Sequence, residues 1–492
     1  MKRVARLTSM GMVGGSLACL VIFGYLLGTY GFALHYLGLL GISVSLLIGL
    51  RLTVSQQVNL LLTLLSSVIA LYSMEAFLAF SPSVLNHSPT TAWIEFPQDA
   101  NARVAAERVQ MEKRTNKNFD TRSRLEVVRD LRMKGIKAYP DVFPTVLFKP
   151  GSGTAIKSIF DSHNEEFLPL SGPSNTYTVF CNESGEYIGY ESDEHGFHNP
   201  KGIWQGGSAD IVALGDSYAH GVCVAAEHSF VGVIRKRYPA TINLGVNGDG
   251  PLAMLATLKE YGIPFKPKVV LWFYYEGNDS RDLDTREKHS PLLMKYLSSS
   301  YSQGLLKRQD EIDHVLKDYL ETEMAKAVPA ISFESILKLQ HLRRSLWDIY
   351  TRRSSEEGLP AELIDHFTLM STPSGEDDLL LLRQILIEAQ KSVSPWNGRV
   401  VFVYLPTWER YGLPQLASKD RDQVLTTVRD LGMPFVDVHL AMSSHSDPLS
   451  LFPFRRYGHY NEAGHKLVGE EVLKLLHQPK FGTLMVKQPG EP

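Results

Sequence analysis

The residues whose chemistry stands out are a serine, a glycine, an asparagine and a histidine in four separate blocks. Ser217 ends a Gly-Asp-Ser turn, Gly248 ends Asn-Leu-Gly-Val-Asn-Gly, Asn278 lies in Gly-Asn-Asp, and His459 opens His-Tyr-Asn. A serine hydroxyl becomes a good nucleophile when a base takes its proton, and histidine suits that task because its pKa lies near neutral pH. The tetrahedral intermediate then needs hydrogen-bond donors aimed at its oxygen. The pattern therefore indicates acyl transfer, with Ser217 as nucleophile and His459 as base.

These blocks require a scaffold that brings distant residues to one edge. The stretches typical of strands are 211–214, 241–244, 269–274 and 399–405, and those typical of helices are 229–237 and 252–261. Strands that alternate with helices form a parallel sheet whose crossovers are right-handed. Ligands of such sheets bind outside the carboxyl ends of the strands, so we expect Ser217 to lie at that edge.

On these residues the chain resembles the SGNH (GDSL) hydrolase superfamily, whose name comes from the same four residue types in the same order. The flanking sequences, Gly-Asp-Ser-Tyr-Ala-His-Gly-Val from Gly215 and His-Tyr-Asn-Glu-Ala-Gly-His from His459, look like bacterial members. The resemblance covers residues 176–290 and 395–475. It implies an α/β fold, a flavodoxin-like three-layer α/β/α domain. It also implies an oxyanion hole formed by the backbone N–H groups of Ser217 and Gly248 and the side chain of Asn278.

One position departs from the family pattern, which commonly has an aspartate two or three residues before the histidine. Arg456 and Tyr457 occupy those positions here. A backbone carbonyl could orient the His459 ring, or another acid could approach it in space. The acids that remain as supporting candidates are Asp216, Asp279, Asp437 and Asp447. Loss of the orienting acid can cost about 10⁴ in kcat, so a weak enzyme and a catalytically inactive relative both stay open.

Other histidines have simpler interpretations. His465 is a rival base, but it matches the start of the helix that follows the His-Tyr-Asn block, and we expect a structural role. His220 follows the serine closely and is expected to be a turn residue. His195, His198, Asp216 and His220 have no ligand spacing of a known metal site, so no metal is expected. The sequence has no phosphate-binding or dinucleotide motif, and no cofactor is implied.

The N-terminal region predicts a membrane anchor. Residues 7–50 contain no Asp, Glu, Lys or Arg, which is enough for two spans of about 20 residues each with a turn near residues 29–31. A third apolar segment covers residues 58–80. A signal peptide is the competing interpretation, but the apolar run is too long for one. Because Lys2, Arg3, Arg6 and Arg51 favour the cytoplasm, three spans place the rest of the chain outside.

The remaining chain divides by composition. We expect a membrane region at 1–80, a helical stem at 81–175, the SGNH-like domain at 176–480 with a helical insertion at about 290–393, and a tail at 481–492. Residues 101–133 have apolar residues at helical intervals, and residues 187–199 look like a hairpin. The insertion has helical stretches at 305–327 and 377–389, and a lid or substrate-selecting role stays open.

Composition limits the partners. The 492 residues carry a formal net charge of −3, which indicates no nucleic-acid partner. Cys19 lies in the first predicted span, whereas Cys181 and Cys223 lie in the exported part. A disulfide is permitted there, and two buried thiols are an equal alternative.

Together, the resemblance and the predicted location imply a bacterial inner-membrane protein with a periplasmic serine esterase or O-acyltransferase domain. Its substrates would be acyl esters, chiefly acetyl, of envelope or exported polysaccharide. Lipid or phospholipid esters are a second substrate class. A non-catalytic glycan-binding or assembly subunit is the alternative from another class, and a membrane partner protein stays open.

Overall fold

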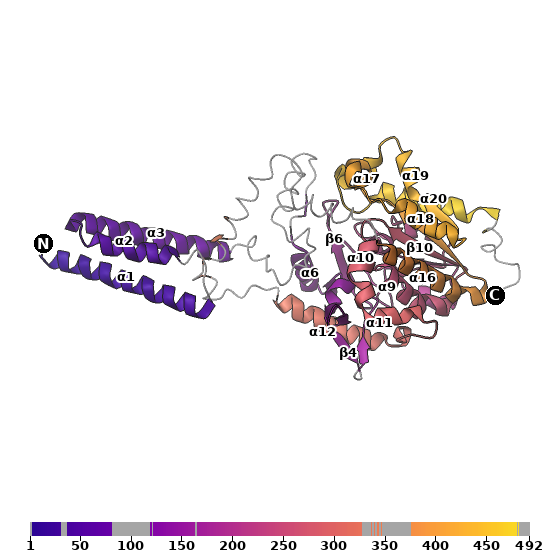
Figure 1. Cartoon of the computed structure of the whole chain (residues 1–492), viewed down its shortest axis with the longest axis horizontal. Coiled ribbons are helices and arrows are strands. Elements are labelled where there is room, and N and C mark those ends of the chain that lie inside the picture. The colour runs from indigo at the N-terminus through magenta and orange to yellow at the C-terminus, as the bar shows by residue number, and fades with distance from the viewer. Residues whose placement is uncertain are drawn as a thin grey trace. The chain divides into compact units, whose positions relative to one another are not determined.

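Figure 1 shows the protein as a computed structural model. The described residues are 2–30, 37–80, 119–326 without 121, 163 and 164, then 336, 339, 342, 343, 346, 375–479 and 481. The chain forms two compact units, residues 1–85 with 329–351 and residues 86–328 with 352–492. The described part of the predicted stem, residues 119–175, therefore belongs to the same unit as the predicted SGNH-like domain.

The first unit contains three apolar helices, α1 (Lys2–Tyr30), α2 (Leu37–Gly49) and α3 (Val54–Phe80). Segments of α1 and α3, Ala5–Tyr25 and Val54–Leu78, are long and apolar enough to cross a membrane. The 13 residues of α2 are fewer than the ~20 that a span needs. Three helices are therefore present as expected, and two of them have the length of a span.

The few polar side chains of these apolar helices form hydrogen bonds within the unit. The hydroxyls of Ser16 and Ser43 lie 2.7 Å apart and join α1 to α2. The buried carboxylate of Glu75 accepts a hydrogen bond of 2.7 Å from the backbone N–H of Leu342. Part of the predicted insertion at 290–393 thus packs in this unit.

The second unit is built on a five-stranded parallel sheet of order β12-β11-β10-β8-β9. Its strands are β8 (Ile211–Leu214), β9 (Thr241–Asn243), β10 (Val269–Tyr275), β11 (Arg399–Leu405) and β12 (Phe435–Asp437). Val269 of β10 is in register with Ile211 on one side and Arg399 on the other. This order is the flavodoxin-like one, so the predicted fold class is confirmed. The short strand β12 was not predicted.

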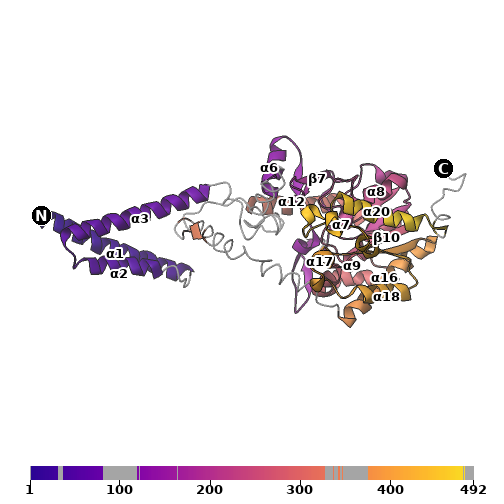
Figure 2. The same cartoon turned by 90° about the horizontal axis from the view of Figure 1, so that it is seen from above.

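Helices cover both faces of the sheet, because side chains of a strand alternate between its faces. Val212 and Leu214 pack in one core cluster, whereas Ile211 and Ala213 pack in another. Figure 2 shows α8 and α20 on one side of β10 and α9, α16 and α18 on the other. These helices are α8 (Phe230–Arg237), α9 (Pro251–Thr257), α16 (Glu376–Val393), α18 (Arg421–Asp430) and α20 (Glu462–Leu476).

The helix α16 corrects the predicted extent of the insertion. Its residues Leu382, Ile385 and Leu386 are buried in the same cluster as Phe402 of β11. The helix therefore forms part of the layer that covers the sheet, as the crossover between β10 and β11. The other predicted insertion helix, at 305–327, is present as α12 (Gln309–Lys326). Most of residues 327–374, which belong to the insertion for which a lid role was considered, lies outside the described residues.

The region before the sheet is mixed and not only helical. It has one α-helix in its described part, α6 (Arg124–Met133), followed by short strands and single 3-10 turns. Strands β1 (Ala138–Pro140), β6 (Tyr177–Cys181) and β7 (Ile188–Glu191) form a three-stranded sheet, and β6 and β7 form an antiparallel hairpin. The predicted hairpin thus begins before residue 187, and residues 101–118 of the predicted helical region 101–133 lie outside the described residues.

The remaining strands and α-helices of the described part are short. They are β2 (Phe148–Pro150), β3 (Ile156–Ser158), β4 (Phe160–Ser162), β5 (Glu165–Phe167), α7 (Ser217–His220), α10 (Asp279–Thr285), α11 (Pro291–Met294), α17 (Glu409–Gly412) and α19 (Val438–Ser443).

Candidate active site

Three of the four blocks follow neighbouring strands of the sheet. Ser217 follows β8, Gly248 follows β9 and Asn278 follows β10, and β8 lies between the other two. Because the strands are parallel, their carboxyl ends meet at one edge of the sheet. The topology therefore brings the serine, glycine and asparagine blocks to the same edge, with the serine in the middle.

The turn that carries Ser217 is closely packed. At Gly215 the backbone φ is +156°, and a Cβ atom would lie 2.7 Å from the Cβ of Ala219, so only glycine fits. The carboxylate of Asp216 accepts a hydrogen bond of 3.0 Å from the backbone N–H of Tyr218 and caps α7. Ser217 is therefore held as the first residue of α7, with 6% of its surface exposed.

His459 meets Ser217 from a distant part of the chain. Its Nε2 lies 2.8 Å from Oγ of Ser217. The histidine precedes α20, whose first turn is capped by the side chain of Asn461. The hydroxyl of Tyr218 donates a hydrogen bond of 3.1 Å to the carbonyl of Gly458 and so fixes the histidine loop on α7. The structure thus brings the predicted nucleophile and base into hydrogen-bond contact.

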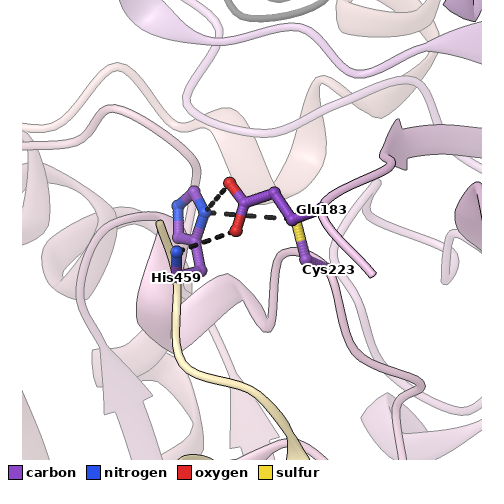
Figure 3. A group of neighbouring side chains, drawn as sticks. All are labelled: Glu183, Cys223 and His459. Atoms are coloured by element: carbon purple, nitrogen blue, oxygen red, sulfur yellow. Dashed lines mark hydrogen bonds and ion pairs between the residues drawn. The ribbon is translucent and has the colours of Figure 1, made fainter. Parts of the chain in front are cut away.

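The other nitrogen of His459 faces an acid that the sequence analysis did not identify. Oε1 of Glu183 lies 2.8 Å from Nδ1 of His459, and Oε2 accepts a 2.8 Å hydrogen bond from the backbone N–H of the same residue. Figure 3 shows the carboxylate facing the ring. Glu183 lies in the turn between β6 and β7. Side chains of Ser217, His459 and Glu183 therefore form one hydrogen-bonded chain.

The two acids considered for this position lie elsewhere. Asp437 pairs with Arg421 and accepts a hydrogen bond of 3.2 Å from the backbone N–H of His439, which caps α19. Asp447 pairs with Arg455. The structure therefore places Glu183, and neither Asp437 nor Asp447, against His459.

Opposing effects set the protonation of His459. Burial lowers its pKa, but the charge of Glu183, the hydrogen bond to Glu183 and the charge of Asp216 outweigh that effect. The result is a pKa above the ordinary value of a histidine. Such a ring is a stronger base than a free imidazole and is stabilised when it takes a proton from Ser217.

The groups expected to form an oxyanion hole have defined surroundings. Gly248 adopts a φ of +78°, and its carbonyl accepts a hydrogen bond of 2.6 Å from Arg286. The side-chain nitrogen of Asn278 donates a hydrogen bond of 3.1 Å to Asp282. Both residues lie at the sheet edge as expected, and their role as donors to an oxyanion stays a prediction.

The acids beside the serine and the asparagine are buried and do not replace Glu183. Burial raises the pKa of Asp216 to about 6. Burial also raises the pKa of Asp279 well above its ordinary value, and its carboxylate accepts a 3.0 Å hydrogen bond from the backbone N–H of Tyr275. Asp216 and Asp279 therefore support the turns around Ser217 and Asn278.

His465 and His220 make buried contacts that suit structural roles. Nδ1 of His465 accepts a hydrogen bond of 3.2 Å from the backbone N–H of Phe230, and burial lowers the pKa of His465 to about 3. Nε2 of His220 lies 2.9 Å from the hydroxyl of Tyr190, and burial lowers the pKa of His220 well below its ordinary value. A lowered pKa makes each ring a weak base with a destabilised imidazolium, so neither is suited to replace His459.

The two cysteines of the second unit, Cys181 and Cys223, form a disulfide. Cys181 and Cys223 are bonded, with their Cα atoms 5.5 Å apart, which is an ordinary spacing for such a bond. Ligand atoms of Glu183, Cys223 and His459 lie within 4.8 Å of one another, as they would around a metal ion. The Cys223 sulfur is already bonded to Cys181, and metal ligation requires a thiolate. The cluster therefore fits a triad with an adjacent disulfide better than a metal centre.

Fold and site together define a class of protein. It is an α/β chain of flavodoxin-like topology in which a serine, a histidine and a carboxylate are joined by hydrogen bonds at the carboxyl edge of a parallel sheet. Serine hydrolases on several unrelated folds use this constellation.

No profile of a protein family and no curated protein matches the chain. Similar solved structures include a lipolytic G-D-S-L family protein from Veillonella parvula, at 12% identity over 54% of this chain and 97% of that chain, with a TM-score of 0.28. A lipase/acylhydrolase from Enterococcus faecalis has 14% identity over 57% of this chain and 99% of that chain, with a TM-score of 0.30. A two-domain esterase active on acetylated mannans has 13% identity over 59% of this chain and 53% of that chain, with a TM-score of 0.27.

Proposed function

We propose that the chain is an SGNH-type serine esterase or O-acyltransferase, with Ser217 as nucleophile, His459 as base and Glu183 as the orienting acid. The observation that carries this proposal is the continuous set of hydrogen bonds from Ser217 Oγ through His459 to Glu183. In the first step Nε2 of His459 takes the proton of Ser217 as its oxygen attacks the ester carbonyl. His459 then returns that proton to the leaving alkoxide, and an acyl-enzyme remains.

The acyl-enzyme can be resolved in two ways. Water attack completes hydrolysis, and attack by a sugar hydroxyl completes transfer. His459 serves as base for either acceptor, so the same three residues support both reactions. We propose acyl esters of envelope or exported polysaccharide as the substrate class, with acetyl as the acyl group and lipid esters as the alternative. The position of Glu183 removes the main reason for an inactive binding subunit, which was the lack of an acid near His459.

We further propose that the catalytic unit lies outside the cytoplasm. A third crossing needs more than the 13 residues of α2, and the sequence 31–50, which contains α2 and no Asp, Glu, Lys or Arg, has the length for it. If this segment crosses together with α1 and α3, and Lys2 and Arg3 are inside, the chain after α3 is outside. If only α1 and α3 cross, it is inside. The Cys181–Cys223 disulfide favours the first topology, because such bonds persist in oxidising compartments.

Serine-directed labelling tests the proposed chemistry. The full chain in detergent is treated with a fluorophosphonate and assayed for release of p-nitrophenol from p-nitrophenyl acetate. Wild type should be labelled and active, whereas Ser217→Ala should lose both signals. Ser444→Ala, which changes an exposed serine whose hydroxyl donates a hydrogen bond of 2.9 Å to the nearby carbonyl of Leu440, is the control and should keep both. Labelling that does not depend on Ser217 would refute the assignment.

A further inference from the structure

The acid of the proposed triad lies on a different segment from the histidine that it supports. Glu183 and His459 are 276 positions apart, and Glu183 lies in a turn between two short strands. A side chain in a turn loses conformational entropy when it is held in one geometry, so the turn needs an anchor. The question is what keeps this carboxylate at 2.8 Å from Nδ1.

The disulfide lies where such an anchor is needed. Cys181 is the last residue of β6, and Glu183 follows two positions later. The chain advances at most ~3.6 Å per residue, so the Glu183 Cα cannot lie more than about 7 Å from that of Cys181. On the other side of the bond, Cys223 follows α7, and its sulfur lies 4.0 Å from Nδ1 of His459 (Figure 3). The bond thus links the acid-bearing turn to the segment that carries Ser217.

The surroundings of the bond protect it from solvent. Cys181 and Cys223 are 3% and 5% exposed and belong to a small apolar cluster with Phe180, Tyr190 and Val222. The turn has non-covalent contacts on its far side, where Asn182 donates a hydrogen bond of 2.6 Å to the carbonyl of Asp120. Those contacts hold the turn against residue 120, whereas the disulfide holds it against the loop after α7.

We propose that the Cys181–Cys223 disulfide is the positioning element for Glu183, and that the hydrogen bonds between Glu183 and His459 depend on it. Cys181 and Cys223 are therefore positioning residues, because they act on the geometry of Glu183 and His459 and take no part in making or breaking bonds. The kinetic consequence rests on the proposed function, whereas the effect on His459 itself does not.

Kinetics test the dependence through a double-mutant cycle. Cys181→Ala/Cys223→Ala is made in the full chain, in the wild-type and in the Glu183→Gln background, and kcat/KM is measured on p-nitrophenyl acetate. Breaking the bond should lower kcat/KM by about tenfold or more in wild type. In the Glu183→Gln background it should lower kcat/KM by less than about twofold, because effects of coupled residues are not additive. An equal fold-loss in both backgrounds would mean general destabilisation and would overturn the proposal. Val222→Ala, which loosens the same cluster and leaves the bond intact, is the control and should retain activity.

The protonation of His459 provides a readout that does not require activity. Histidine labelled with ¹³C is titrated by NMR, and the His459 signal is assigned by its loss in His459→Gln. The His459 pKa should fall in the double-cysteine variant, as in Glu183→Gln, and stay unchanged in Val222→Ala. An unchanged His459 pKa in the double-cysteine variant would refute the proposal that the disulfide positions Glu183. A wild type without Ser217-dependent hydrolysis would instead refute the proposed function. The titration would still decide whether the disulfide positions Glu183.

If the double-cysteine variant does not fold, reduction of the folded protein replaces it. A dithiol delivers two electrons and two protons to the two sulfurs, which become thiols, and leaves as its own cyclic disulfide. Cys19→Ala is the background, so that every thiol counted comes from the pair. Appearance of two thiols should coincide with the fall in the His459 pKa, and two thiols without that fall would overturn the proposal.

Discussion

The carboxylate of Glu183 contacts His459 twice, with Oε1 at 2.8 Å from Nδ1 and Oε2 at 2.8 Å from the backbone nitrogen. The first contact holds the ring in the tautomer whose Nε2 lone pair faces Ser217. The second contact fixes the loop that carries the ring. A glutamate from the β6–β7 turn therefore orients His459, while the positions just before the histidine hold Arg456 and Tyr457.

Replacement of Glu183 by glutamine should lower kcat/KM by about 10²–10⁴, because the amide cannot stabilise the imidazolium and can hold the wrong tautomer. The measurement is steady-state hydrolysis of p-nitrophenyl acetate. Glu186→Gln is the matched control, since Glu186 is an exposed acid of the same turn. Activity of Glu183→Gln within a factor of two of the control would exclude the orienting role.

The activity should rise with pH through the pKa of His459, because only the neutral ring can accept the serine proton. Burial lowers that pKa, but Glu183 and Asp216 raise it by more than burial lowers it. The midpoint of the rise in kcat/KM should therefore lie at a pH above 6.5, the ordinary pKa of histidine. Loss of the negative charge in Glu183→Gln lowers the pKa, and the rise should then move to lower pH. A profile of log kcat/KM against pH checks this, and an acidic limb that does not move would contradict it.

The two histidines near the start of α20 should respond differently to substitution. His459→Gln removes the base and should reduce kcat/KM by about 10³ or more. His465→Gln removes a buried acceptor for the N–H of Phe230 and should lower the melting temperature, while kcat/KM stays within about threefold. Thermal unfolding and kinetics of both variants distinguish the roles. Loss of activity in a folded His465→Gln would reverse the assignment of the base.

Gly458 should be required for the approach of Glu183 to the histidine loop. A Cβ atom at this position would lie 2.8 Å from Oε2 of Glu183, and the backbone φ is +146°. Gly458→Ala should therefore displace the carboxylate and lower kcat/KM about tenfold or more. At Gly432 the φ is +65° and a Cβ atom would meet no atom within 4 Å, so Gly432→Ala is a control for backbone strain alone. Equal kinetics of the two variants would show that the Gly458 contact does not matter.

Asp249 should make folding stability depend on pH. Both of its carboxyl oxygens are buried and have no hydrogen-bond partner among the described residues, and burial, followed by the charge of Glu287, raises its pKa well above the ordinary value. Between the unfolded pKa of about 3.9 and the raised folded pKa, the unfolded state binds fewer protons, so stability is lost as pH rises. Asp249→Asn resembles the protonated acid and should reduce the loss of melting temperature between mildly acidic and mildly alkaline pH. Asp422→Asn, at an exposed acid, should leave that loss unchanged, and the same loss in both variants would contradict the role of Asp249.

Local patterns predicted four of the five sheet strands within one residue at each end, because each is an apolar run bounded by turns. The strand β12, Phe435–Asp437, directly follows Pro434 and ends on an acid that caps the next helix, so its sequence does not have the form of an apolar run bounded by turns. The helix α16 was assigned to an insertion because a crossover helix that follows a long excursion has the same amphipathic sequence as an inserted one. The helix packs on the sheet because it connects β10 to β11, which are neighbouring strands, and this order of strands is not visible in the local sequence.

The sequence by itself determined the strand-and-turn units that end in Ser217, Gly248 and Asn278, because β propensity and glycine conformations act over a few residues. It also indicated His459 through the residues around it. Only the tertiary structure decided that Glu183 meets His459 and that Cys181 bonds to Cys223. An acid in a polar turn has no local feature that marks it as a partner, since the partner is chosen by the way β6, α7 and the loop before α20 pack together.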